Sequence, residues 1–96
     1  MKCREIIENI EKSYPRNYAL EWDNAGLLAG SHEKEVRRIY VALDATDEVI
    51  EAAKAAGADL LVTHHPMIFS PVSRITDEAF IGRRLLRLIQ GNLAYY

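Results

Sequence analysis

A strand–helix–strand pattern in the middle of the chain constrains the fold more than any other feature. Two runs rich in branched and aromatic residues, Arg37–Leu43 and Asp59–Thr63, have the composition of buried β-strands. Between them, Thr46 is a candidate helix N-cap and Gly57 a candidate helix end. Because a helix that connects two strands of one sheet leaves them parallel, we expect a parallel α/β core with 37–43 as its central strand.

The segment before this unit predicts one helix and one further strand. Apolar residues recur with helical spacing from Cys3 to Tyr14, and Pro15 ends that helix. The apolar run Gly26–Gly30 lies between two glycines, and we expect it to form an edge strand.

The segment after this unit predicts a last helix and a last strand. Either Thr76 or Asp77 is expected to cap the helix, Gly91 ends it, and Leu93–Tyr96 begins a strand. The predicted order is α-β-β-α-β-α-β, an α/β layered fold that forms a single domain over residues 1–96. The apolar face of the last helix is expected to comprise Ile81, Leu85, Leu88 and Ile89.

The charge balance and the cysteine content exclude several classes of protein. Twelve Lys and Arg against fourteen Asp and Glu give a net charge of −2, whereas nucleic-acid-binding domains usually carry a basic excess. No apolar run approaches the roughly 18 residues of a membrane span, and residues 1–15 alternate charged and apolar side chains, unlike a signal peptide. The single cysteine, Cys3, forms no internal disulfide. We expect a cytoplasmic protein that binds neither nucleic acid nor membrane.

The strongest local signal for chemistry is Thr63-His64-His65-Pro66, directly after a predicted strand. Ligands of open α/β sheets bind beyond the carboxyl ends of the strands, and neutral imidazole is the commonest metal ligand. Adjacent residues of a regular strand point to opposite faces, so both histidines serve one site only if the backbone turns there, as Pro66 favours. We expect both rings on one side, at a metal site. The alternative is one packed and one solvated histidine.

Other polar residues are weaker candidates for a site. Asp44 follows the strand 37–43, where its carboxylate either orients a histidine ring or starts the next helix. Trp22, Asp23 and Asn24 either line a pocket or form a turn beside a core tryptophan. If they line a pocket, we expect Asp23 and Asn24 on the same rim as the histidine pair.

Three arginines, Arg83, Arg84 and Arg87, share one face of the last predicted helix. Such a cluster could bind phosphate, but the net charge of −2 favours a face exposed to solvent or to another subunit. His32 lies in a polar turn and is expected to be exposed, and Cys3 is expected to be a small core residue.

Four segments resemble one known family in their order and spacing. They are Glu21–Leu27, Val41–Thr46, Gly57–Thr63 and His64–Phe69. The chain is similar along essentially its whole length to the Nif-three-like proteins, a dinuclear metal-centre family also known as type 2 homologues of GTP cyclohydrolase I. The motif WDNxGL followed by THHPxIF is a specific combination, and it indicates this family far more strongly than the histidine pair alone.

This resemblance implies a Nif-three-like layered fold, two divalent metal ions per full-length subunit and a toroidal homohexamer. It implies that His64 and His65 are metal ligands, and it places Trp22, Asp23 and Asn24 in a family signature that is expected to contact substrate. Histidines with carboxylates suit zinc, iron, manganese or nickel. Family members take an Asp, a His and a Glu ligand from later segments. The chain is therefore expected to be an N-terminal fragment of a larger domain, an incomplete metal-binding lobe.

Two functions of different classes fit these features. The first is a metal-dependent hydrolase acting on an unknown small molecule, in which a dinuclear centre lowers the pKa of a water. The alternative is a non-catalytic metal-binding protein that serves as an oligomeric scaffold or metallochaperone. Because the resemblance places further ligands in other segments, we expect this chain alone to hold at most one metal loosely and to be inactive.

Overall fold

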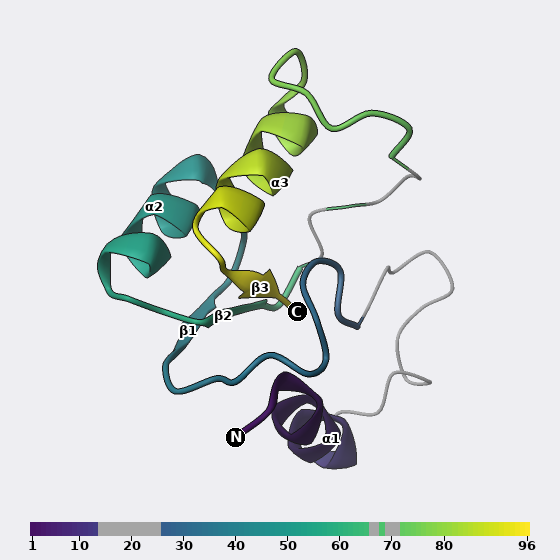
Figure 1. Ribbon diagram of the computed structural model, residues 1–96, viewed down its shortest axis with the longest axis vertical. Helices are drawn as coiled ribbons and strands as arrows, with labels where there is room; N and C mark the ends of the chain where they lie inside the picture. Colours follow the sequence, from purple (N-terminus) through teal and green to yellow (C-terminus); the bar gives the residue numbers. More distant parts are fainter. Residues whose placement is uncertain (14–25, 66–67, 69–71) are drawn as a thin grey trace.

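The computed structural model describes residues 1–13, 26–65, 68 and 72–96 (Figure 1). In this part of the chain, helices and strands alternate, which confirms the predicted α/β class. The helices are α1 (Cys3–Ser13), α2 (Asp47–Ala55) and α3 (Phe80–Gln90), and the strands are β1 (Ile39–Ala42), β2 (Leu60–Thr63) and β3 (Ala94–Tyr95).

The sheet is parallel, and β2 is its central strand. Ile39 of β1 pairs with Leu60 of β2, which pairs in turn with Ala94 of β3, so the strand order is β1-β2-β3. The predicted parallel strand–helix–strand unit is confirmed. The prediction that 37–43 forms the central strand is wrong, because α3 returns the chain to the side of β2 that β1 does not occupy. Both runs are apolar, so composition could not rank their positions.

The run Gly26–Gly30 lies at the sheet edge beside β3, but it forms a single antiparallel bridge rather than a strand. Ala29 accepts a hydrogen bond of 2.9 Å from the Tyr95 amide, and the Leu28 amide donates one of 2.9 Å to the Tyr95 carbonyl. Gly30 then has φ +106°, a backbone conformation that turns the chain away from the sheet and ends the pairing.

The two faces of the sheet carry separate hydrophobic cores. Leu61 packs with Ile50 of α2 and Leu88 of α3, whereas its neighbour Leu60 packs with Ile6 of α1. Both leucines of β2 are fully buried. Figure 1 accordingly shows α2 and α3 on one side of the sheet and α1 on the other. The fold is therefore three-layered, with one helical layer on each face of β2.

The helix ends agree with the sequence in one case and differ in another. Thr46 caps α2 as predicted, since its hydroxyl accepts a hydrogen bond of 3.2 Å from the Val49 amide. At α3, however, neither Thr76 nor Asp77 is the cap; the N-cap is Ala79, which makes no side-chain cap bond. The expectation that Ile89 belongs to the buried apolar face of α3 is also wrong, because this residue is 60% exposed.

A close backbone contact explains why α3 begins later than predicted. The carbonyl oxygen of Thr76 lies where a Cβ on Gly82 would sit, only 2.2 Å from that position. Gly82 is itself buried in the helix. The segment before α3 therefore folds back over the first turn of the helix, and only a residue without a side chain fits at position 82.

We expect Gly82→Ala to destabilise the chain by about 1–3 kcal/mol, since the Thr76 backbone must move to admit a methyl group. Urea denaturation followed by circular dichroism measures the change. Gly91→Ala is the matched control, because the atoms nearest to its new Cβ belong to the flexible Lys54 side chain. Equal losses in the two variants would contradict the proposed contact.

Candidate metal centre

The histidine pair and Asp44 lie together at the carboxyl ends of β1 and β2. Asp44 follows β1 after one intervening residue, and His64 and His65 directly follow β2. Backbone hydrogen bonds to the end of β1 continue beyond β2: the His64 amide donates to the Ala42 carbonyl at 3.3 Å, and the His65 amide donates to the Leu43 carbonyl at 3.1 Å. These bonds fix the backbone of both histidines beside the end of β1.

The two imidazole rings lie against each other. Their centroids are 4.8 Å apart and their planes meet at 67°, an edge-on contact. Both residues are exposed. The backbone therefore turns after Thr63, and the prediction that the rings share one side of the sheet is confirmed. The role of His64 and His65 as metal ligands stays a prediction.

The carboxylate of Asp44 holds the ring of His65. Its Oδ1 lies 2.8 Å from Nδ1 of His65, and both side chains are about half exposed, at 54% and 55%. A carboxylate at Nδ1 favours the tautomer with a proton on Nδ1, which leaves Nε2 with a lone pair for a ligand bond. This is the contact expected of a residue that orients a histidine, whereas the adjoining helix takes its cap from Thr46.

Two hydroxyl groups that the sequence analysis missed hold the backbone at His65. The Thr63 hydroxyl donates to the His65 carbonyl at 2.7 Å, and the Tyr95 hydroxyl donates to the same oxygen at 3.2 Å. The two hydroxyls are themselves 2.8 Å apart. Thr63 was visible as part of the motif, but Tyr95 comes from β3, and only the strand order brings it under the turn.

Asp44, His64 and His65 form one corner of the molecule at the strand ends, and the donor atoms of this corner fit part of a metal site. Two imidazoles in contact, one of them oriented by a carboxylate, are suitable ligands for a divalent transition metal. Within the described residues, no group of three or more His, Cys, Asp or Glu side chains could hold a metal ion. The candidates Trp22, Asp23 and Asn24 lie outside the described residues, so their predicted place on the same rim stays a prediction.

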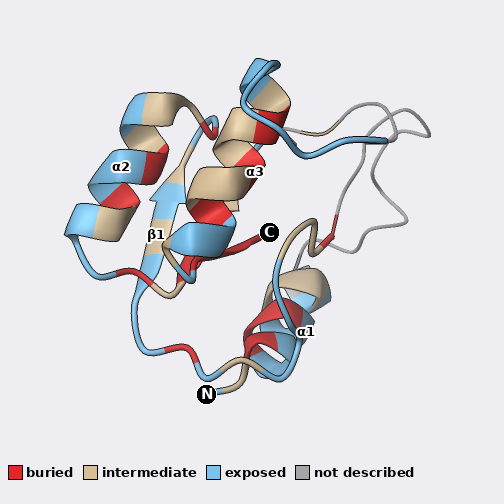
Figure 2. Cartoon of the chain, turned by 45° about the horizontal axis from the view of Figure 1, so that its top comes forward, coloured by how far each residue is buried: buried red, intermediate tan, exposed pale blue. Residues whose placement is uncertain are grey.

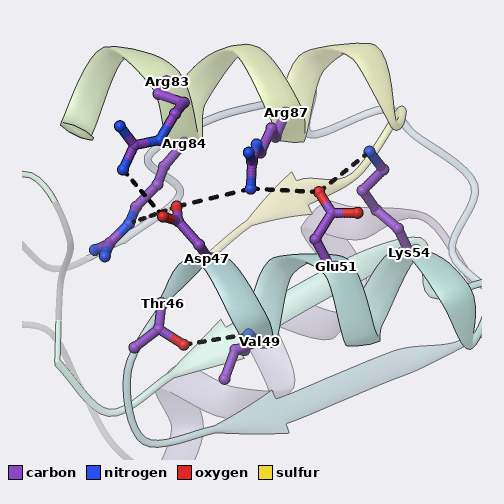
Figure 3. Close-up of polar contacts among 8 residues, drawn as sticks. All are labelled: Thr46, Asp47, Val49, Glu51, Lys54, Arg83, Arg84 and Arg87. Carbon is purple, nitrogen blue, oxygen red and sulfur yellow. Dashed lines mark hydrogen bonds and ion pairs between the residues drawn. The ribbon is translucent and has the colours of Figure 1, made fainter. Parts of the chain in front are cut away.

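The arginines of α3 form ion pairs with acidic residues of α2 (Figure 3). Arg83 Nη2 and Arg84 Nε lie 3.0 Å and 3.1 Å from the two carboxylate oxygens of Asp47. Arg87 Nη1 lies 3.7 Å from Glu51 Oε1. All three arginine side chains are only 22–39% exposed. The arginines are thus a partly exposed face that also forms ion pairs with acidic residues of α2, which the sequence analysis did not predict; that this face meets another subunit and binds no nucleic acid stays a prediction.

The remaining candidates behave as ordinary structural residues. Cys3 is fully buried in the core beside α1, as predicted, and desolvation by this burial raises the pKa of its thiol. His32 is exposed, also as predicted, in the polar turn before β1. Neither residue lies among those gathered around His64 and His65.

Tyr95→Phe removes a hydroxyl that supports the turn at His65. We expect a loss of about 1–2 kcal/mol in the free energy of unfolding, since each net hydrogen bond contributes roughly 1 kcal/mol, and faster exchange of the amides next to His65. Denaturation and hydrogen-exchange measurements check these effects. Tyr40→Phe is the control, because within the described residues its hydroxyl makes no hydrogen bond. A Tyr95→Phe variant with unchanged unfolding free energy and unchanged amide exchange would contradict the view that this hydroxyl supports the turn at His65.

Acid should weaken the contact between α2 and α3. The hydrogen bond from Arg83 holds the pKa of Asp47 below its ordinary value, with a smaller contribution from Arg84. Because the folded pKa is the lower one, the stabilisation is present above about pH 4, the usual unfolded value, and is lost as the pH falls through the folded pKa.

We therefore expect Asp47→Asn to be less stable than the wild type at pH 7, and this difference to shrink as the pH falls below about 4. Urea unfolding at a series of pH values measures it. Glu48→Gln, in the same turn, is the control, since the carboxylate has no ion-pair partner in the described part of the chain. A difference that does not vary with pH would rule out the ion pairs as its cause.

Comparison with known proteins identifies the family. The model of the family DUF34/NIF3 (NGG1p interacting factor 3) matches residues 1–96. A GTP cyclohydrolase 1 type 2 homolog of Clostridium perfringens is 43% identical over 96 residues, which are 100% of this chain and 37% of the relative. The chain thus spans less than half the length of this curated relative.

No helix in the described residues is long and apolar enough to cross a membrane.

Solved structures agree with the sequence comparison. Reduced HcgD from Methanocaldococcus jannaschii is 38% identical in sequence, with a TM-score of 0.90. The match covers 100% of this chain and 38% of the HcgD chain. A Bacillus cereus protein related to NIF3 is 36% identical in sequence, with a TM-score of 0.92. The match covers 100% of this chain and 26% of the Bacillus cereus chain. The fold and the sequence match together, and the chain belongs to the DUF34/NIF3 family.

Proposed function

We propose that this chain supplies part of the ligand set of a divalent-metal centre in a metal-dependent hydrolase. The observation that supports the proposal most directly is the contact between the rings of His64 and His65, 4.8 Å apart at the strand ends, with Asp44 against one of them. The ligand role of both histidines comes from the family resemblance and from the chemistry of imidazole.

Each residue of the corner has a defined task in this proposal. His64 and His65 bind the metal through ring nitrogens, and Asp44 keeps Nδ1 of His65 protonated so that Nε2 is the ligand atom. Thr63 and Tyr95 hold the His65 carbonyl and thereby the direction of its side chain. A bound divalent cation supplies Lewis-acid chemistry and a nucleophile derived from water near neutral pH.

The proposal extends to the longer proteins of the family. In these we expect two divalent metal ions per subunit, a homohexamer, and contacts from Trp22, Asp23 and Asn24 to a small-molecule substrate. We also expect a cytoplasmic location, since one cysteine in 96 residues suits a reducing compartment. The family resemblance supports these expectations.

A second candidate is a metal-binding scaffold or metallochaperone without catalysis. It is favoured by the small number of ligands in the described corner, where two imidazoles and a carboxylate already bonded to one of them come together. A catalytic zinc usually takes three protein ligands. Turnover discriminates the two candidates, because both need metal binding and only one needs a reaction.

Metal titration tests the ligand assignment on this chain. We expect Zn2+ to bind with at most one ion per chain and with weaker than micromolar affinity, since the donor set is partial. His64→Ala and His65→Ala should each weaken binding at least about tenfold, and Asp44→Asn about tenfold. Isothermal titration calorimetry measures these changes.

His32→Ala is the matched control, because His32 is an exposed histidine outside the site. It should bind Zn2+ as the wild type does. Binding that survives both His64→Ala and His65→Ala would disprove the assignment. Two ions per chain at micromolar affinity would disprove the expectation of a partial centre.

The reaction is tested on a longer family member, such as the Clostridium perfringens relative, loaded with metal and assayed against nucleotides and cyclic amidines. Metal-dependent hydrolysis that is lost on removing the metal with a chelator would support the hydrolase. Stoichiometric metal binding without turnover of either class would favour the scaffold.

A further inference from the structure

The ion pairs between α2 and α3 leave a surplus of positive charge. Figure 2 shows the two helices side by side, with the middle of α3 buried or of intermediate burial. Four cationic side chains share two carboxylates there, so two positive charges are not balanced within the network. This α2–α3 ion-pair network consists of Arg83, Arg84, Arg87 and Lys54 with Asp47 and Glu51.

Arg87 is the arginine that the network binds least closely. Its Nη1 lies 3.7 Å from Glu51 Oε1 and 4.0 Å from Asp47 Oδ1, and both distances are too long for a hydrogen bond. Within the described residues the guanidinium of Arg87 therefore makes ion pairs but no hydrogen bond. Its side chain is 36% exposed, so its five N–H donors can serve a ligand that comes from solvent.

The three arginines are close together on one face of α3, and Arg84 is held in place. Arg83 and Arg87 are four positions apart, and Arg84 and Arg87 are three apart, so like charges lie next to each other on the helix and repel. Arg84 Nε lies 3.1 Å from Asp47 Oδ1, and its Cζ lies 5.0 Å from the centre of the Phe80 ring, a cation–π contact. A second anion beside the arginines would relieve the repulsion without first having to order Arg84.

We propose that the α2–α3 ion-pair network binds the phosphate group of a small, soluble phosphate monoester. Such a group carries a charge of about −1.5 to −2 at pH 7, which matches the surplus of the network. Planar guanidinium groups pair well with phosphate oxygens. Asp47 is the first residue of α2, so the positive end of that helix dipole lies at the same place. The surplus is local, because the whole chain has a net charge of −2, and this favours a small anion over a nucleic acid.

Asp47 has two opposite effects in this proposal. Its carboxylate stabilises the contact between the helices, and it also competes with a phosphate for the donors of Arg83 and Arg84. Asp47→Asn should therefore lower the stability of the chain and at the same time strengthen phosphate binding. A network with a structural role alone gives the loss of stability without the gain in binding. The inference does not depend on the proposed metal chemistry.

Titration of the 15N-labelled chain with methyl phosphate, followed by NMR at constant ionic strength, tests the site. We expect saturable shifts of the Nε–H signals of the three arginines. Arg84→Gln and Arg87→Gln should each weaken binding at least about tenfold, because each removes a charged hydrogen-bond donor. Asp47→Asn should strengthen it about threefold or more, because a competing negative charge is lost. Circular dichroism checks that the variants fold, and Arg87→Gln breaks no hydrogen bond within the described residues.

Arg4→Gln is the matched control, because Arg4 is an ion-paired arginine on α1, on the other side of the sheet. This variant should bind methyl phosphate as the wild type does. A second arm replaces methyl phosphate with phosphatidylcholine vesicles that contain phosphatidic acid, and binding to the vesicles alone would overturn the assignment to a soluble ligand. The proposal is also overturned if shifts do not saturate, if Arg87→Gln binds as tightly as the wild type, or if Asp47→Asn binds more weakly.

Discussion

The burial of β2 from both faces is the constraint on which the rest of the structure depends. Leu60 and Leu61 are adjacent, fully buried and directed to opposite sides, so the strand needs an apolar layer on each face. α1 provides one layer, and α2 with α3 provides the other. Because the same strand ends in His64 and His65, the packing that stabilises the sheet also sets the position of the candidate metal ligands.

Local signals were sufficient for most helices and strands but not for their neighbours in space. The spacing of apolar residues predicted α1, and Thr46 predicted the start of α2, since both depend on contacts within a few residues. The central position of β2 was missed because it depends on where α3 returns the chain. The delayed start of α3 was missed because it depends on the close approach of the Thr76 backbone to Gly82.

The residues of the candidate site also divide into those that the sequence could predict and those that depend on strand pairing. The histidine pair and Asp44 could be predicted because each follows a strand, and the carboxyl ends of parallel strands meet at one edge. Tyr95 could not, because its hydroxyl reaches His65 only after β3 has paired with β2. The pairing of Arg83 and Arg84 with Asp47 likewise joins residues that are 36 and 37 positions apart in the chain.

Tyr95 links two segments that lie far apart in the sequence. Its backbone pairs with Ala29, and its hydroxyl bonds to the His65 carbonyl. A fluctuation that lifts β3 from β2 must therefore release the Gly26–Gly30 edge and loosen the histidine turn in a single event. The geometry of the two imidazoles is thus coupled to the local opening equilibrium of a two-residue strand, so a substitution that contacts neither ring can alter their preorganisation.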